Sequence, residues 1–94
     1  MTSVGLLTVD FHISESFSLK QKRAVLKSIR ERVRGKFNVS IAEVDNHDKW
    51  QLATFAISCV AGSKKQVNSI MDNVRDFFIR ERSVIVQDYR LEII

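Results

Sequence analysis

The apolar residues of this chain change their spacing in a fixed order, and that order constrains the fold more than any other feature. From Leu7 to Ile13 the residues alternate, with Leu7, Val9, Phe11 and Ile13 on one face. An alternation of period two is typical of a half-buried strand. Residues 18–35 instead carry apolar side chains three and four positions apart, as an amphipathic helix does. The chain therefore begins with a strand followed by a helix.

Capping signals mark the ends of two predicted helices. Ser18 and Ser63 are each followed three residues later by a glutamine, Gln21 and Gln66. This is the spacing of a capping box, in which the serine hydroxyl binds a free backbone N–H group. We expect Gly35 to end the first helix by adopting a left-handed backbone. The second helix carries its apolar stripe on Val67, Ile70, Met71, Val74, Phe77 and Phe78.

Three further stretches are predicted to be strands. Residues 37–44 and 49–61 alternate around a polar cluster, Asp45–Asp48, and this pattern favours a β-hairpin. Residues 83–94 are rich in Val and Ile and predict the last strand. The order β-α-β-β-α-β indicates a single ferredoxin-like domain over residues 1–94, an α+β sandwich. Right-handed crossovers give an antiparallel sheet of order 4-1-3-2 with both helices on one face.

Three motifs in this chain resemble the YlxP-like family of small bacterial proteins. They are Ser18-Leu19-Lys20-Gln21-Lys22-Arg23, Phe37-Asn38-Val39-Ser40-Ile41-Ala42-Glu43-Val44-Asp45 and Asp48-Lys49-Trp50-Gln51. The resemblance covers essentially the whole chain and implies a ferredoxin-like fold. It implies no biochemical activity, because the family has none established. Its genes often stand beside genes of translation initiation and ribosome maturation, which implies a translational or RNA-related context.

The positive charge of the chain is concentrated in the first predicted helix. Residues 18–36 hold eight of the fifteen Lys and Arg residues and one acid, Glu31, which gives eight minus one, or +7. The whole chain is only +4, so the other residues together sum to −3. One side of the helix carries Lys20, Arg23, Lys27, Arg30 and Arg34 within an arc of about 80°. We call these five residues the basic stripe.

Two interpretations of the basic stripe stay open. Cations on successive helical turns can follow a nucleic-acid backbone. A solvated helix face with some charges paired to acids would have the same composition. Lys22 stands apart because it falls in the middle of the apolar arc. It either extends past the end of the sheet to water, the interpretation we favour, or pairs with Glu43, Asp10 or a bound anion.

The hairpin and the uncovered face of the sheet supply the other candidates. Glu43, Asp45, His47 and Asp48 lack the spacing of a metal set, so we expect no metal and no cofactor. We expect Trp50 to point onto the face that the helices leave open, where it either marks an interface or packs on its own hairpin. The apolar side chains expected on that open face are Val4, Leu6, Leu52, Ala56, Val84 and Val86.

These observations favour a binding module over an enzyme. The chain has no anion-binding loop after the first strand and no nucleophile elbow. Cys59 is the only cysteine, and its place in the alternation puts it on the core side of the strand. No apolar stretch is long enough for a membrane span, and no signal peptide is visible. We therefore expect a cytoplasmic protein. The first hypothesis is RNA or ribosome binding through Lys20, Lys22, Arg23, Lys27, Arg30 and Arg34. The alternative is a homodimer, or a module binding protein or a small ligand, that uses Leu6, Trp50 and Leu52 on the open face.

Overall fold

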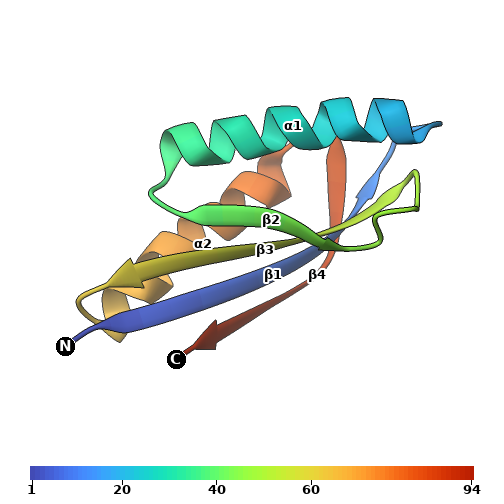
Figure 1. Ribbon diagram of the computed structural model, residues 1–94. Helices are drawn as coiled ribbons and strands as arrows, with labels where there is room; N and C mark the ends of the chain where they lie inside the picture. The colour runs from blue at the N-terminus through green and yellow to red at the C-terminus, as the bar shows by residue number, and fades with distance from the viewer.

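The computed structural model describes all residues from Met1 to Ile94. Figure 1 shows a four-stranded sheet with two helices, in the predicted order β-α-β-β-α-β. The elements are β1 (Ser3–Ile13), α1 (Leu19–Lys36), β2 (Ser40–Asp45), β3 (Leu52–Ala61), α2 (Lys64–Arg80) and β4 (Val84–Ile93). The two chain termini lie at the same end of the sheet (Figure 1).

The sheet is antiparallel throughout, and its strand order is β2-β3-β1-β4. This is the predicted order read in reverse, so the ferredoxin-like topology is confirmed. Both helices cover one face, with α1 above the β2 side of the sheet and α2 behind β1, β3 and β4 (Figure 1). The opposite face carries no helix, and we call it the open face.

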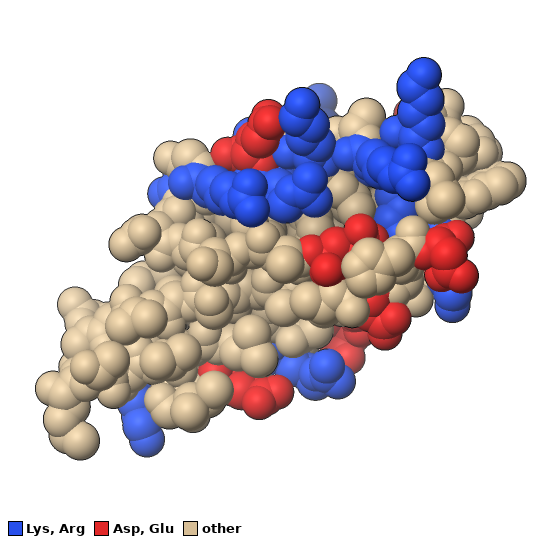
Figure 2. Space-filling view, viewed as in Figure 1, with Lys and Arg blue, Asp and Glu red and all other residues tan.

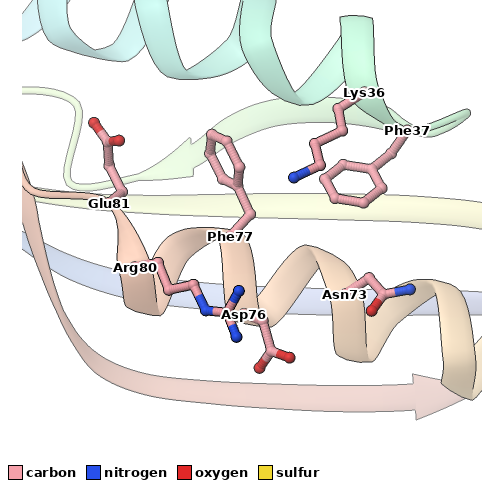
Figure 3. A pocket seen from close by; sticks show the side chains of 7 residues that line it. All are labelled: Lys36, Phe37, Asn73, Asp76, Phe77, Arg80 and Glu81. Atoms are coloured by element: carbon pink, nitrogen blue, oxygen red, sulfur yellow. The ribbon is translucent and has the colours of Figure 1, made fainter.

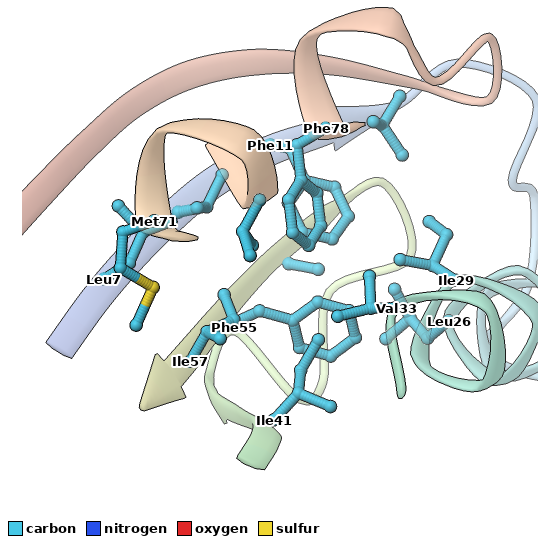
Figure 4. Packing of buried hydrophobic residues seen from close by; sticks show 14 of the residues in the cluster. Leu7, Phe11, Leu26, Ile29, Val33, Ile41, Phe55, Ile57, Met71 and Phe78 are labelled. Carbon is cyan, nitrogen blue, oxygen red and sulfur yellow. The ribbon is translucent and has the colours of Figure 1, made fainter. Parts of the chain in front are cut away.

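The core lies between the sheet and the two helices, and it follows the predicted alternation. Leu7, Val9, Phe11 and Ile13 are all buried, as are Phe55 and Ile57 on the neighbouring strand. Phe11, Phe55 and Phe78 pack against one another with ring centroids 5.5 to 6.1 Å apart (Figure 4). Rings in tilted and edge-to-face contact stabilise a core beyond the area they bury.

The backbone of β1 lies close to helix α2 at Gly5. A Cβ atom built at this position would overlap Cγ1 of Val67 on α2. Any larger residue would therefore push α2 away from the sheet. Next to it lies Cys59, which is buried, and burial raises the pKa of its thiol. Cys59 thus serves as a small apolar side chain, as its parity predicted.

The first helix ends differently from the prediction. Gly35 has no positive φ, and α1 continues through it to Lys36. The chain leaves the helix at Phe37, which is extended and whose N–H donates to the Val33 carbonyl at 2.8 Å. The Phe37 ring packs edge-to-face on Phe77 at 6.4 Å. This contact directs the exit of the chain, so no left-handed glycine is needed.

The prediction for the last strand is also wrong in part. Val84 is buried in the core and Val86 packs against it, so neither lies on the open face. The register between β1 and β4 shifts between Asp10 and Phe11, where Phe11 pairs with Val86 and Asp10 with Asp88. The extra residue, Gln87, forms a β-bulge, and a bulge reverses the alternation beyond it.

The second and third strands begin later than predicted, at Ser40 and Leu52. Residues 46–51 form a longer connection in which Asn46 has a positive φ of 61°. Asparagine tolerates this left-handed backbone better than most residues do. Neither helix is long and apolar enough to span a membrane.

Candidate nucleic-acid interface on helix α1

Helix α1 starts at the predicted capping box. The Ser18 hydroxyl accepts the Gln21 N–H at 3.1 Å, and the Gln21 side chain accepts the Phe17 N–H at 2.7 Å. From this start, Leu26, Ile29 and Val33 turn into the core. The apolar arc fixes the rotation of the helix about its axis, and so it also fixes where the basic stripe points.

The basic stripe lies along the outer flank of α1 beside the β2 edge. Figure 2 shows Lys and Arg side chains gathered along the helix at the rim of the molecule. Lys20, Arg23, Lys27 and Arg34 are exposed, and Arg30 is half-buried. Arg34 reaches the Ile41 carbonyl of β2 at 3.4 Å. At 1.5 Å per residue, the five cations span about 21 Å of helix axis.

No member of the basic stripe has a carboxylate partner. The four ion pairs of the chain involve Lys22, Arg32 and Arg75 and none of the five stripe residues. Side chains of Lys20, Arg23, Lys27 and Arg30 make no hydrogen bond to the protein either. The acids that the second interpretation pairs with some of these charges are not at this face, but a solvated helix face agrees with the exposed side chains, so both interpretations stay open. Four of the five cations make no polar contact to the protein, and Arg34 contacts only the Ile41 carbonyl.

Lys22 belongs to the fold and not to this interface. Its side chain is 2% exposed, and its ammonium lies 3.0 Å from Oε2 of Glu43. It also donates to the carbonyl oxygens of Asn46 at 2.6 Å and Lys49 at 2.8 Å. The favoured interpretation, a side chain reaching past the sheet to water, is wrong, and the pairing with Glu43 is correct. Asp10 instead accepts the Thr54 hydroxyl at 2.7 Å.

Arg32, on the other flank of α1, makes the contrast with the basic stripe plain. Its guanidinium forms a bidentate pair with Glu81, with both N–O distances 2.8 Å. Together with the Ser83 hydroxyl, which donates to Glu81 at 2.6 Å, this pair lowers the pKa of Glu81 to about 2. The hydrogen bonds to Glu81 also raise the pKa of Arg32 above its ordinary value. The cation that faces α2 thus has a matching acid.

A hollow of about 420 Å³ lies beyond this pair, between the C-terminal end of α1 and α2 (Figure 3). Phe37 and Phe77 are its two hydrophobic residues, and Lys36, Asp76, Arg80 and Glu81 supply charges of both signs. Lys36 and Arg32 already lie over the two rings, at 5.7 and 5.6 Å from the centroids. Its charged groups therefore favour no single class of ligand.

The predicted interface residues fall into two groups. Leu6 lies on the open face opposite Ser58, whereas Leu52 pairs with His12 at the other end of β1. Six residues of strand separate these positions, or about 20 Å. Trp50 lies in the connection before β3 and shares a hollow with Leu52 and His12. The structure therefore brings Trp50 and Leu52 together, and it places Leu6 apart from both.

Phe17 is a candidate that the sequence reasoning missed. It is 64% exposed and lines the same hollow as Trp50. A signal was available, because an apolar residue just before the helix cap usually packs on the fourth helical residue. That fourth residue is Lys22, whose side chain points into the protein. Phe17 has no apolar partner there and stays at the surface.

Comparison with known proteins places the chain in one family. A family model described as a protein of unknown function (DUF503) matches residues 4–91. The chain is similar to an uncharacterised protein, YlxP, from Bacillus subtilis (strain 168). The two are 42% identical over 74 residues, which cover 79% of this chain and 80% of that protein. The expected resemblance to YlxP-like proteins is confirmed, and the chain belongs to the DUF503 family of proteins of unknown function.

Proposed function

We propose that this chain is a non-catalytic, cytoplasmic RNA-binding module that contacts phosphates through the basic stripe on α1. The observation that carries the proposal is that none of the five cations has a carboxylate within ion-pair distance. Ribosomal RNA is the class of RNA we propose, in keeping with the translational context that the family resemblance implies. Lys22 is left out of the interface, because its ammonium is fully engaged inside the protein.

The energetics of the helix support an external partner for the basic stripe. Like charges three and four residues apart repel by a few tenths of a kcal/mol per pair. Elsewhere on α1 the chain supplies an acid for the cation that packs against it, Glu43 for Lys22 and Glu81 for Arg32. It supplies none for the basic stripe. Phosphates on a nucleic-acid strand would relieve this repulsion and release counterions.

The salt dependence of RNA binding tests the proposal. Log affinity should fall linearly with log salt, with a slope of about 0.7 to 0.9 per neutralised phosphate. Reversing three stripe charges (Arg23→Glu, Lys27→Glu, Arg30→Glu) should flatten this slope by about 2 to 3. A filter-binding or anisotropy titration at several salt concentrations measures it, and cosedimentation with ribosomal particles extends it to the cell extract.

The matched control reverses three exposed cations elsewhere, Lys64, Lys65 and Arg90, which changes the net charge by the same amount. If both triple variants lose the same slope, general charge and not the basic stripe drives binding. No RNA binding by the unaltered chain at low salt would refute the proposal outright.

A second candidate function is self-association through the open face, and one observation favours it. The half of the open face near the chain termini carries the apolar side chains of Val4 and Leu6 on β1 and Val60 on β3, although Glu92 of β4 stands beside Leu6. The Val60 side chain is 66% exposed. In this case the chain would be a homodimeric interaction module and the basic stripe a charged surface. The measurement that decides is the mass of the chain in solution.

A further inference from the structure

Two large aromatic side chains line one surface hollow at the N-terminal end of α1. Phe17 is 64% exposed and Trp50 is 54% exposed. The hollow is shallow and wide open to solvent, measures about 660 Å³, and is also lined by His12, Asp48, Lys49, Gln51 and Leu52. Every other phenylalanine of the chain is buried or packed against the core. We call this site the aromatic hollow.

Hydrogen bonds hold the two walls of the aromatic hollow in place. The Gln51 side chain, next to Trp50, donates to the Ser16 carbonyl, next to Phe17, at 3.1 Å. The Gln51 carbonyl accepts the Ile13 N–H at 2.8 Å. The buried Lys22 ammonium also donates to the Lys49 carbonyl, at 2.8 Å. These hydrogen bonds fix the backbone that carries Phe17 and Trp50, so little backbone entropy is lost when a ligand binds.

The aromatic hollow lies at the same end of α1 as Lys20, the first residue of the basic stripe. Phe17 immediately precedes the helix cap, and Lys20, the first stripe residue, follows it by three positions. A chain whose phosphates follow the stripe towards the N-terminus of α1 therefore arrives at the hollow. Cationic tracks next to exposed aromatic rings are how proteins bind single-stranded nucleic acids, because every base has a face that stacks.

We propose that the aromatic hollow binds an unpaired base of single-stranded RNA while the basic stripe binds the adjoining phosphates. Asp48, Lys49 and His12 offer acceptors and donors to the polar edge of that base. This inference rests on the proposed RNA-binding function and narrows it to single strands. A duplex keeps its bases stacked inside, so it can reach the basic stripe but not the aromatic hollow.

Trp50 is the only tryptophan of the chain, so its fluorescence reports on the hollow directly. The probes are a short single-stranded RNA of mixed sequence, the same strand annealed to its complement, and the same strand with abasic ribose residues. We expect the single strand alone to quench Trp50. Equal quenching by the abasic strand would overturn the inference. Quenching that increases with protein concentration in the absence of RNA would also overturn it, because a second copy of the chain would then fill the hollow.

Variants separate this inference from the proposed function. Phe17→Ala and Trp50→Ala should each weaken single-strand binding roughly five- to a hundredfold and leave the salt slope unchanged, as read by anisotropy of labelled RNA. Tyr89→Ala, an exposed aromatic on β4, should change neither quantity. Phe17→Leu keeps the apolar bulk without the ring and guards against a folding defect. If Phe17→Ala and Trp50→Ala bind RNA with wild-type affinity while the salt slope still depends on the basic stripe, only this inference is overturned. If the unaltered chain binds no RNA, both this inference and the proposed function are overturned.

Discussion

At the scale of single residues, Lys22 is the side chain on which α1 and the β2–β3 connection depend together. Its ammonium forms an ion pair with Glu43 and donates hydrogen bonds to two backbone carbonyls. We expect Lys22→Met to lower the free energy of unfolding by about 3 kcal/mol, because the buried Oε2 atom of the half-buried Glu43 loses its counter-charge. Denaturant unfolding measures this change. The neighbouring Lys20→Met, at an exposed stripe position, should cost less than about 0.5 kcal/mol, and equal losses would contradict the role of Lys22.

Glu81 makes the stability of the fold depend on acid pH. Its pKa of about 2 lies below its ordinary 4.5, since Arg32 and Ser83 favour the charged form. A lowered pKa stabilises the folded chain at all pH values above about 4.5, and this contribution is lost as the pH falls from there towards 2. The Arg32 side chain is 45% exposed, so screening by solvent limits the effect to about 1 kcal/mol.

The pH dependence is measured by chemical unfolding of the unaltered chain and of Glu81→Gln between pH 6 and about 2. The variant should be less stable at pH 6, and the difference between the two should shrink as the pH falls. If the two curves stay parallel through this range, the Arg32–Glu81 pair contributes nothing that depends on charge.

At the scale of elements, the sequence predicted what depends on local periodicity. The alternation of Leu7, Val9, Phe11 and Ile13 and the capping serines Ser18 and Ser63 each act within a few residues. The angular position of the basic stripe also follows from the helical period alone. These features lie where the sequence placed them because no distant contact competes with the local pattern.

The elements that sequence reasoning missed are decided by contacts between distant segments. The end of α1 is set by Phe37 packing on Phe77, forty residues away, and not by the local signal of Gly35. The bulge opposite Asp10 and Phe11 reverses the parity of β4, and a bulge leaves no mark in the alternation of one strand. Lys22 was ambiguous for the same reason, because Glu43 comes near it only after β2 joins the sheet.

At the scale of the whole molecule, charge divides the surface into separate regions. Cations follow α1 along one rim, while acids gather towards the hairpin end of the open face (Figure 2). Asp10 and Asp88 even stand opposite each other on neighbouring strands, and like charges so placed are destabilising. Apolar residues of the open face stand at both of its ends, with Val4, Leu6 and Val60 towards the chain termini and Leu52 and Ile85 towards the hairpin. A second copy that docks on Val4, Leu6 and Val60 would avoid the like-charged pair of Asp10 and Asp88.

This division predicts which substitutions control self-association. If the open face forms a homodimer, Leu6→Lys with Val60→Lys should reduce the mass in solution from two chains to one, because two lysines would be buried without partners. Leu52→Lys, at the hairpin end about 20 Å away, should leave the dimer intact. Sedimentation or light scattering of the three proteins makes the comparison. If the unaltered chain has the mass of one copy in solution, the open face forms no homodimer interface. The surface of α1 is then the main candidate for binding a partner.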